Sequence, residues 1–332
     1  MKNAYACINK DESLRRDESS GGVFSLLARY TLRCGGIVFA AVYDENLNVV
    51  HRGLKAEKEL SAAYGAKYAA SKFVDCFQEI KISLEEKKKV LFVGTPCQCA
   101  ALRHSVGEHD YLICVDFVCH GVPDSKYWQM YLRSLQEANG LLIKSVNMRD
   151  KTSGWTKYRY CWKFEDKNGR LLYQKQRDNL YMKGFVENYY LQQACYSCQF
   201  KGNNRFSEIT LGDFWGVWET KPEFDDDKGT SLVIIRSEKG RRLFNAIRSD
   251  LLYTELDESD YIGYNPSLIK TATKPDGYDC FQARLKNGED IQKLIAEYTG
   301  SEYKKGVILE GRNYFRLKLL GSNIKRYLKE SR

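Results

Sequence analysis

The sequence predicts a mixed α/β protein, and three patterns indicate this fold class. VLFVGT (90–95), CAALRHSV (99–106) and YLICVDFVC (111–119) form a strand–helix–strand unit with apolar strands, as in parallel sheets buried on both faces. From about Ile143, KYRYCWKFED and RLLYQKQRD alternate polar with apolar residues, which is typical of antiparallel strands. The last seventy residues are helix-biased and basic. We therefore expect an N-terminal α/β unit with parallel strands, a largely antiparallel C-terminal part and a helical basic tail.

The elements before the strand–helix–strand unit follow from local signals. SSGGVFSLLARYTLRCGG (19–36) begins with helix-capping residues, is apolar at helical spacing and ends on two glycines, which predicts a helix. IVFAAVYDENLNVVHRGL (37–54) has β-rich runs on both sides of a polar turn, which predicts a hairpin. A further helix is expected over Ala62 to Phe77, before a lysine-rich turn at 87–89.

The elements after this unit alternate between strand and helix signals. SEITLGDFWG (207–216) contains a strand that ends in a glycine-rich turn, and SLVIIRS (231–237) is a second strand. EKGRRLFNAIRSD (238–250) then has the spacing of an amphipathic helix.

The cysteine content indicates a reducing compartment. At 332 residues the chain can bury a core without disulfides, yet it has 11 cysteines, an odd number, several of them in apolar runs. The N-terminus lacks the features of a signal peptide, and no apolar stretch approaches the ~18 residues of a membrane-spanning helix. We expect a cytoplasmic protein without a membrane span, whose cysteines are core residues, metal ligands or redox groups.

The net charge of +9 is concentrated at the C-terminus. Residues 301–332 contain nine Lys and Arg against three Glu, a net of +6, so the rest of the chain is close to neutral. This distribution and the absence of a recognised binding module disfavour a nucleic-acid partner. A basic tail is usually a solvated helix face, and the alternative is a docking surface for an acidic partner.

Four cysteines form the strongest candidate site. Cys97 and Cys119 follow two strands that, if they are neighbours, lie ~4.8 Å apart, so both thiols reach one edge of the sheet. CYSC supplies the closely spaced pair Cys195 and Cys198. A thioredoxin-like pair would begin a helix after a strand, and a zinc ribbon would need a second C-x-x-C. An iron-sulfur cluster fits two single cysteines and one pair, although Cys99 is an alternative to Cys97. A mixed zinc site that combines the pair with Cys97 or Cys119 is the other alternative.

A glycine-rich helix start is the candidate phosphate site. Ser19, Ser20, Gly21 and Gly22 precede an apolar helix, where free amide donors and the helix dipole favour an anion. Lys67 and Lys72 in YGAKYAASKF are candidate counter-charges. The same residues also make an ordinary helix cap, so this motif alone is weak.

Two further motifs carry candidate cofactor contacts. In GDFWG, Asp213 is placed to bind a ribose hydroxyl or a ring nitrogen, with two aromatics to flank a flat cofactor; the alternative is a tight turn filled by aromatic side chains. RDKTSGW (149–155) offers two cations and a serine for a phosphate or an acidic substrate. The candidates for a general acid or base are His120, Lys151 and Asp213, and none is assigned this role.

In the order and spacing of these motifs, the chain resembles the coenzyme F420 hydrogenase/dehydrogenase beta-subunit family. The resemblance runs from about Ser19 to Arg248, through SSGGVF, GTPCQ, CHGVP, RDKTSGW, CYSCQFK, ITLGDFWG and KGTSLVIIR. It implies a 4Fe-4S cluster on the cysteines of GTPCQ, CHG and C-x-x-C, which are Cys97, Cys119, Cys195 and Cys198. It also implies FAD near that cluster, with the SSGG segment at its phosphates.

The resemblance further implies an oxidoreductase that couples one-electron transfer from a ferredoxin-type partner to hydride transfer with a small organic substrate or coenzyme. It divides the chain into an N-terminal family domain (1–88), a C-terminal family domain with the cluster cysteines (89–250) and a helical basic extension (251–332). No C-x-x-C-x-x-C run precedes Ser19, so electrons are expected from a separate ferredoxin or another subunit. A non-catalytic electron-transfer subunit and a zinc-stabilised binding protein are the alternatives.

Overall fold

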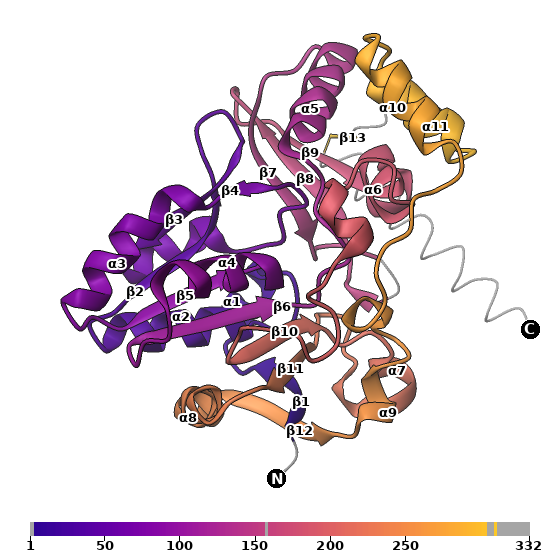
Figure 1. The fold of residues 1–332 in the computed structure, drawn as a ribbon. Helices are drawn as coiled ribbons and strands as arrows, with labels where there is room; N and C mark the ends of the chain where they lie inside the picture. Colours follow the sequence, from indigo (N-terminus) through magenta and orange to yellow (C-terminus); the bar gives the residue numbers. More distant parts are fainter. Residues whose placement is uncertain (1–2, 157–158, 304–308, 311–332) are drawn as a thin grey trace, which may run out of the picture.

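A computed structural model describes residues 3–156, 159–303, 309 and 310 of the chain. Its architecture is a large mixed sheet flanked by helices, with a smaller antiparallel sheet beside it (Figure 1). Within the described residues, the large sheet has nine strands, in the order β12 (Leu251–Leu256), β1 (Ala4–Asn9), β11 (Ser231–Ile235), β10 (Ile209–Asp213), β6 (Leu112–Phe117), β5 (Val90–Gly94), β2 (Ile37–Tyr43), β3 (Val49–Leu54) and β4 (Ser71–Lys72). The mixed α/β fold class is therefore confirmed.

The centre of the large sheet is parallel, as the apolar strands predict. β2 pairs in parallel with β5, β5 with β6, and β6 with β10. β5 is followed by helix α4 (Pro96–Val106) and then by β6, which confirms the strand–helix–strand unit. Most strand pairs on either side of this centre are antiparallel, including the expected β2–β3 hairpin and the β10–β11 pair, whereas the short β4 pairs in parallel with β3.

Helices cover both faces of the large sheet. On one face, α2 (Val23–Arg33) and α8 (Glu238–Ile247) contribute Leu27, Phe244 and their neighbours to a buried cluster. On the other face, α3 (Phe77–Glu85) and α4 bury Ile80 and Leu102 against the sheet. Apolar side chains on both faces of β5 and β6 are thereby removed from water, which explains why these strands are apolar throughout.

The smaller sheet carries the antiparallel pattern predicted from Ile143 onward. Within the described residues, its strands lie in the order β13 (Leu309–Glu310), β9 (Leu171–Lys175), β8 (Cys161–Asp166) and β7 (Ile143–Asp150), all antiparallel. A second core lies against it, centred on the buried rings of Trp128, Trp162 and Tyr181. The helices that contribute to this core are α5 (Ser125–Asn139), α6 (Leu180–Val186), α10 (Tyr278–Lys286) and α11 (Ile291–Tyr298).

The prediction of a helix over Ala62 to Phe77 is wrong. A 3-10 helix, η1, ends at Ala63, and Gly65 takes a left-handed φ of 75°, which a helix cannot include. The chain then pairs Ser71 and Lys72 with the edge of β3 as β4, and α3 begins only at Phe77. The apolar spacing of this segment reflects packing on the sheet edge rather than a helix.

The three predicted parts of the chain share the large sheet. Its strands come from 1–88, from 89–250 and, through β12, from 251–332, so the division stays a prediction about family boundaries. The described portion of the extension contains α9 (Glu258–Tyr261), α10 and α11, and the basic segment 311–332 lies outside the described residues. None of the helices in the described portion has the length and apolar character needed to cross a bilayer.

Candidate functional site

The four predicted ligand cysteines line one pocket. Cys97, Cys119, Cys195 and Cys198 all border a cavity of about 230 Å³ at the C-terminal edge of β5 and β6. The remaining walls come from the loop after β6, the segment around the 3-10 helix η5 (Gln193–Ser197) and the residues that follow it, including His120, Phe200 and Lys201. Segments nearly a hundred residues apart are therefore brought together at this edge.

Cys97 is held by the start of a helix. Thr95 caps α4, accepts from the amide of Gln98, and its own amide donates to the Gln98 Oε1 at 2.9 Å. Pro96 occupies the first turn, where a missing N–H costs no hydrogen bond. The Thr95 hydroxyl lies 3.1 Å from the Cys97 Sγ, and Cys97 is exposed at the pocket. Cys99, the predicted alternative, is fully buried in the core beside β6.

The other three thiols are positioned by main-chain contacts around the loop after β6. The Lys201 Nζ donates to the Cys119 carbonyl at 2.5 Å and to the Ser267 carbonyl at 2.9 Å, which ties this loop to two others. The Val122 amide donates to the Cys195 Sγ at 3.4 Å. Cys195 and Cys198 thus face the pocket as parts of a tight turn joined to the β6 loop.

Burial and the neighbouring charges shift the pKa values of the groups that line the pocket. Burial raises the pKa of Cys119 to about 12, an effect opposed by Lys201 and reinforced by the other three thiols. Burial likewise raises the pKa of Cys195 and lowers that of Lys201. Because ligation requires thiolates, binding of cationic metal here would release protons from these sulfurs.

The four thiols are distributed around the pocket and do not converge on one atomic position. Across the described residues, no group of three or more His, Cys, Asp or Glu side chains is arranged to hold a single metal ion. A four-iron cluster makes a different demand, because its cysteine ligands are distributed around a body of several atoms. Four sulfurs lining one pocket fit that requirement in donor type and number.

His120 borders the pocket but has a partner of its own. Its Nε2 is 2.6 Å from the Asn188 Oδ1, and its ring packs edge-on against Phe185. Burial lowers the pKa of His120, so the neutral ring is favoured. The structure therefore gives this residue a structural contact beside the pocket.

The predicted phosphate segment is packed against the large sheet. A Cβ on Gly21 would lie 2.2 Å from the Cys7 carbonyl oxygen, so the glycine allows β1 and the segment to approach closely. The Gly21 amide donates to the Ser231 Oγ, and the Ser20 hydroxyl donates to the Thr230 carbonyl.

The first turn of α2, which follows this segment, already binds a carboxylate of the protein itself. The buried Glu18 carboxylate accepts from the Ser25 amide in the first turn of α2 at 2.8 Å. Burial raises the pKa of Glu18. Protein groups thus occupy donors that the sequence assigns to a phosphate.

Arg149 joins the predicted cofactor residues, a role that the sequence motif did not single out. Its Nη1 pairs with the Asp213 carboxylate at 2.7 Å and reaches the Tyr68 hydroxyl at 3.3 Å, and its Nη2 reaches the Ser19 carbonyl at 3.2 Å. Its guanidinium lies 4.2 Å from the centre of the Tyr160 ring. The only sequence signal was its position at the head of RDKTSGW.

The RDKTSGW segment completes this polar cluster. Lys151 donates to the carbonyls of Arg15 and Ser20, at 2.5 and 2.6 Å, and burial lowers its pKa to about 7. Trp155 donates from its ring nitrogen to the Ser19 carbonyl at 3.1 Å and stacks on Trp215 at 4.9 Å. Ser19, Ser20 and Asp213 are thus brought together.

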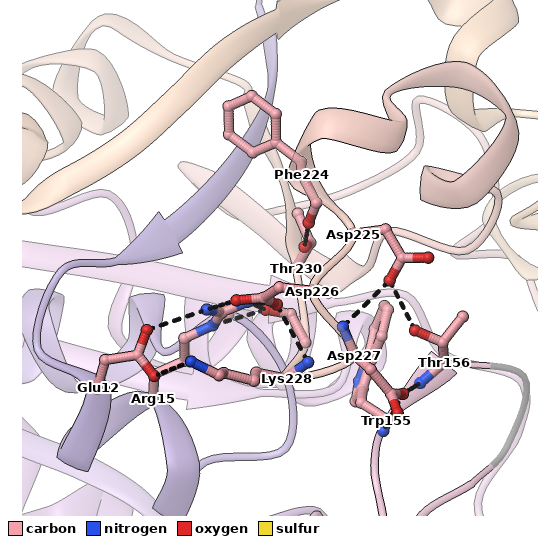
Figure 2. Close-up of polar contacts among 12 residues, drawn as sticks. Glu12, Arg15, Trp155, Thr156, Phe224, Asp225, Asp226, Asp227, Lys228 and Thr230 are labelled. Carbon is pink, nitrogen blue, oxygen red and sulfur yellow. Dashed lines mark hydrogen bonds and ion pairs between the residues drawn. The ribbon is translucent and has the colours of Figure 1, made fainter.

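An acidic loop fixes this cluster to the N-terminal helix α1 (Glu12–Asp17). Figure 2 shows Arg15 in a two-pronged pair with the Asp226 carboxylate, and its Nε donates to the Gly229 carbonyl at 2.9 Å. On the other side of the loop, Asp227 accepts from the Trp155 amide at 2.7 Å (Figure 2). The loop therefore positions RDKTSGW against the SSGG segment.

Lys67 directly precedes Tyr68, which contacts Arg149, but the Lys67 ammonium bonds to other groups. Its ammonium donates to the carbonyls of Ala63, Tyr64 and Gly65 at 3.3, 3.1 and 3.2 Å. Partial burial lowers the pKa of Lys67 to about 7. The ammonium also lies 5.5 Å from the centre of the Tyr43 ring. A half-buried cation of this kind would be stabilised by an anion, as the sequence predicts, because opposite charge offsets lost hydration.

Comparisons with known proteins agree with this architecture. The family model for the C-terminal part of the coenzyme F420 hydrogenase/dehydrogenase beta subunit matches residues 87–260, more than half of the chain. Among solved structures, a chain from the xenon-derivatised F420-reducing [NiFe] hydrogenase complex of Methanosarcina barkeri shares the fold, with a TM-score of 0.54 and 16% identity over 92% of this chain and 97% of that one. No curated protein matches the sequence.

Proposed function

Because the chain belongs to the coenzyme F420 hydrogenase/dehydrogenase beta-subunit family, a family of redox proteins, we propose that it is an oxidoreductase with a 4Fe-4S cluster and FAD. The reaction would couple one-electron exchange with a ferredoxin-type partner to hydride transfer with a small organic substrate or coenzyme. The observation that supports the cluster is the single pocket lined by Cys97, Cys119, Cys195 and Cys198.

The chain's own residues would prepare this pocket for a cluster. When bound, a 4Fe-4S cluster moves single electrons and a flavin moves electron pairs with a proton, so together they interconvert the two kinds of transfer. The Thr95 hydroxyl and the Val122 amide lie within hydrogen-bond range of two ligand sulfurs and would stabilise their negative charge. Lys201 fixes the Cys119 loop and places a positive charge beside the thiols.

Support for the flavin comes from the family and from one half-buried cation, Lys67. The amides of Gly21 and Ser25 are bonded to protein oxygens, so they do not support a phosphate contact as placed. Lys67, with its lowered pKa, is the predicted residue whose environment best suits an anion. We expect Lys67→Met to lower the FAD content of the purified protein, and the exposed neighbour Lys72→Met to leave it unchanged.

Replacement of single cysteines tests the cluster. Anaerobically purified wild type should contain about four irons and four sulfides per chain and show a brown iron-sulfur spectrum. Serine at any of the four pocket positions should lower the iron content severalfold. Serine at Cys34 or Cys280, both exposed and outside the pocket lining, is the matched control and should change nothing.

Other outcomes would favour the alternatives. A colourless protein with one zinc per chain would establish the zinc-stabilised binding protein. Iron that survives serine at all four positions would show that the pocket is not the cluster site. A loaded chain that exchanges electrons but reduces no hydride acceptor would be an electron-transfer subunit, as expected if activity requires partners like those in the hydrogenase complex that shares its fold.

A further inference from the structure

The surface around the mouth of the thiol pocket combines exposed apolar and basic side chains. Three large hydrophobic residues are exposed here: Phe117 at the end of β6, Phe206 after the C-x-x-C segment, and Ile269 after the 3-10 helix η8 (Pro266–Leu268), with exposed fractions of 38%, 45% and 51%. Lys270 and Lys274 are exposed beside them. These five residues are called the pocket rim.

Hydrogen bonds connect the chain segments that carry the pocket rim. Lys201 bridges the Cys119 and Ser267 carbonyls, and the Gly202 amide donates to the Leu268 carbonyl at 2.8 Å. The loops that carry Phe206 and Ile269 are therefore fastened to the β6 loop. Phe206 also packs edge-on against Phe200, which lines the pocket.

Phe117 is joined to the same surface. Its carbonyl accepts from the Arg205 Nη1 at 3.4 Å, and Arg205 directly precedes Phe206 in the chain. The segments that carry the three exposed apolar side chains are thus linked to one another and to the segments that line the thiol pocket.

The charge of this surface has one sign. The segments that form it, 95–107, 117–123, 192–206 and 265–275, contain no Asp or Glu. Two acids flank these segments closely along the chain, Asp116 and Glu208, but both are buried and paired with arginines. Lys274 lies over the rings of Tyr196 and Tyr278, 5.7 and 4.7 Å from their centres, and Tyr196 stands between the two cysteines of the C-x-x-C pair. Positive charge is therefore placed beside the proposed cluster.

We propose that the pocket rim is the docking surface for a separate iron-sulfur electron carrier whose own surface is rich in carboxylates. Electron-transfer complexes use small interfaces, below about 1,200 Å², in which complementary charge guides the encounter. A small apolar centre with lysines beside it matches an acidic partner, and the segments that carry it are hydrogen-bonded to residues that line the thiol pocket. The inference rests on the proposed function, in which those thiols hold a cluster.

Binding of a purified acidic two-cluster ferredoxin to the full-length, anaerobically prepared protein tests the docking surface. The rim variant K270E/K274E reverses both lysines. The control K81E/K88E makes the same charge change at exposed lysines on and after α3, which lies at the opposite end of Figure 1 from the 265–275 loop. Ile269→Ser removes exposed apolar area without changing charge. Dissociation constants are measured at about 50 mM and about 300 mM salt, which differ in charge screening.

We expect the rim variant to weaken binding at least tenfold at low salt, with a smaller difference at high salt. Ile269→Ser should weaken binding at both salt concentrations, and K81E/K88E should stay within about twofold of wild type after screening. Equal effects of the rim and control variants, or no binding to wild type, would overturn the proposal. Loss of binding on removal of 311–332, together with unchanged binding by the rim variants, would also overturn the proposal.

Iron and sulfide analysis of the same samples separates the two proposals. Full iron content with unchanged rim binding would reject the docking surface and keep the cluster. Absence of iron and sulfide from wild type would reject the cluster assignment and the docking surface that rests on it. Equal iron in wild type and variants shows that a change in affinity comes from the surface.

Discussion

Lys67 illustrates how a single half-buried cation contributes to the pH dependence of stability. Its three hydrogen-bond partners are main-chain carbonyls, which satisfy the ammonium but do not neutralise it. Burial therefore lowers its pKa to about 7, well below the ordinary value for lysine. Between about pH 7 and about pH 10, Lys67 is therefore protonated in the unfolded chain and largely deprotonated in the folded chain.

Lys67→Met should flatten the pH dependence of stability in this range. Stability of wild type should rise with pH between about 7 and 10, because the unfolded state binds more protons, with a slope from this residue of at most about 1.4 kcal/mol per pH unit. Urea unfolding under anaerobic conditions at several pH values measures the slope. The exposed Lys72→Met is the control and should keep the wild-type slope. Parallel profiles for wild type and Lys67→Met would contradict the assignment.

At the scale of elements, Arg149 couples strands from the two sheets. It stands in β7 of the smaller sheet, and its partner Asp213 ends β10 of the larger one. The same guanidinium reaches the carbonyl of Ser19 ahead of α2. The Arg149 side chain is 4% exposed and the Asp213 side chain 17%, so either charge left alone would be poorly hydrated.

A double-mutant cycle should reveal this coupling. Arg149→Met leaves the Asp213 carboxylate without its cation, and we expect a loss of about 3 kcal/mol in unfolding free energy, at the low end for a broken buried pair because Asp213 keeps some solvent contact. When Asp213→Asn is added, the double variant should lose at least about 1 kcal/mol less unfolding free energy than the sum of the losses of the two single variants. Additive losses in anaerobic urea unfolding would show that the two residues act independently.

At the scale of the whole molecule, two basic features bear on the proposed partner. One is the pocket rim, and the other is the segment 311–332, where seven Lys and Arg stand against one Glu, a net of +6 that leaves +3 for the rest of the chain. Long-range attraction of an acidic partner depends on the total, whereas contact depends on the local surface.

Removal of 311–332 should therefore slow association more than it speeds dissociation. We expect the association rate of the acidic ferredoxin to fall severalfold at low salt and to approach the wild-type rate at high salt, since exposed charges are screened within about 10 Å at 0.1 M. Residues 309 and 310, which form β13, are retained so that its pairing with β9 is preserved. Stopped-flow association at two salt concentrations measures the effect. An unchanged rate at low salt would remove the tail from partner recognition.

Local signals explain why the sequence predicts most elements correctly. The parallel strands β5 and β6 are apolar because both of their faces are covered, and α4 begins where Thr95 and Pro96 specify a helix start. The prediction of a helix over Ala62 to Phe77 failed because the structure of this segment depends on a non-local contact, the pairing of Ser71 and Lys72 with β3. Local spacing carries no information about a strand edge supplied from elsewhere in the chain.

The sequence by itself determined the fold class, the parallel strand–helix–strand unit and the four cysteines worth considering, because these depend on periodicity, capping residues and spacing. Only the tertiary structure decided that Cys97 borders the pocket while Cys99 is in the core, since two residues along a helix start change which way a side chain faces. It likewise decided that Arg149 meets Asp213 and that Glu18 serves the helix start. Such contacts join residues far apart in sequence, and they are fixed by how the sheets pack.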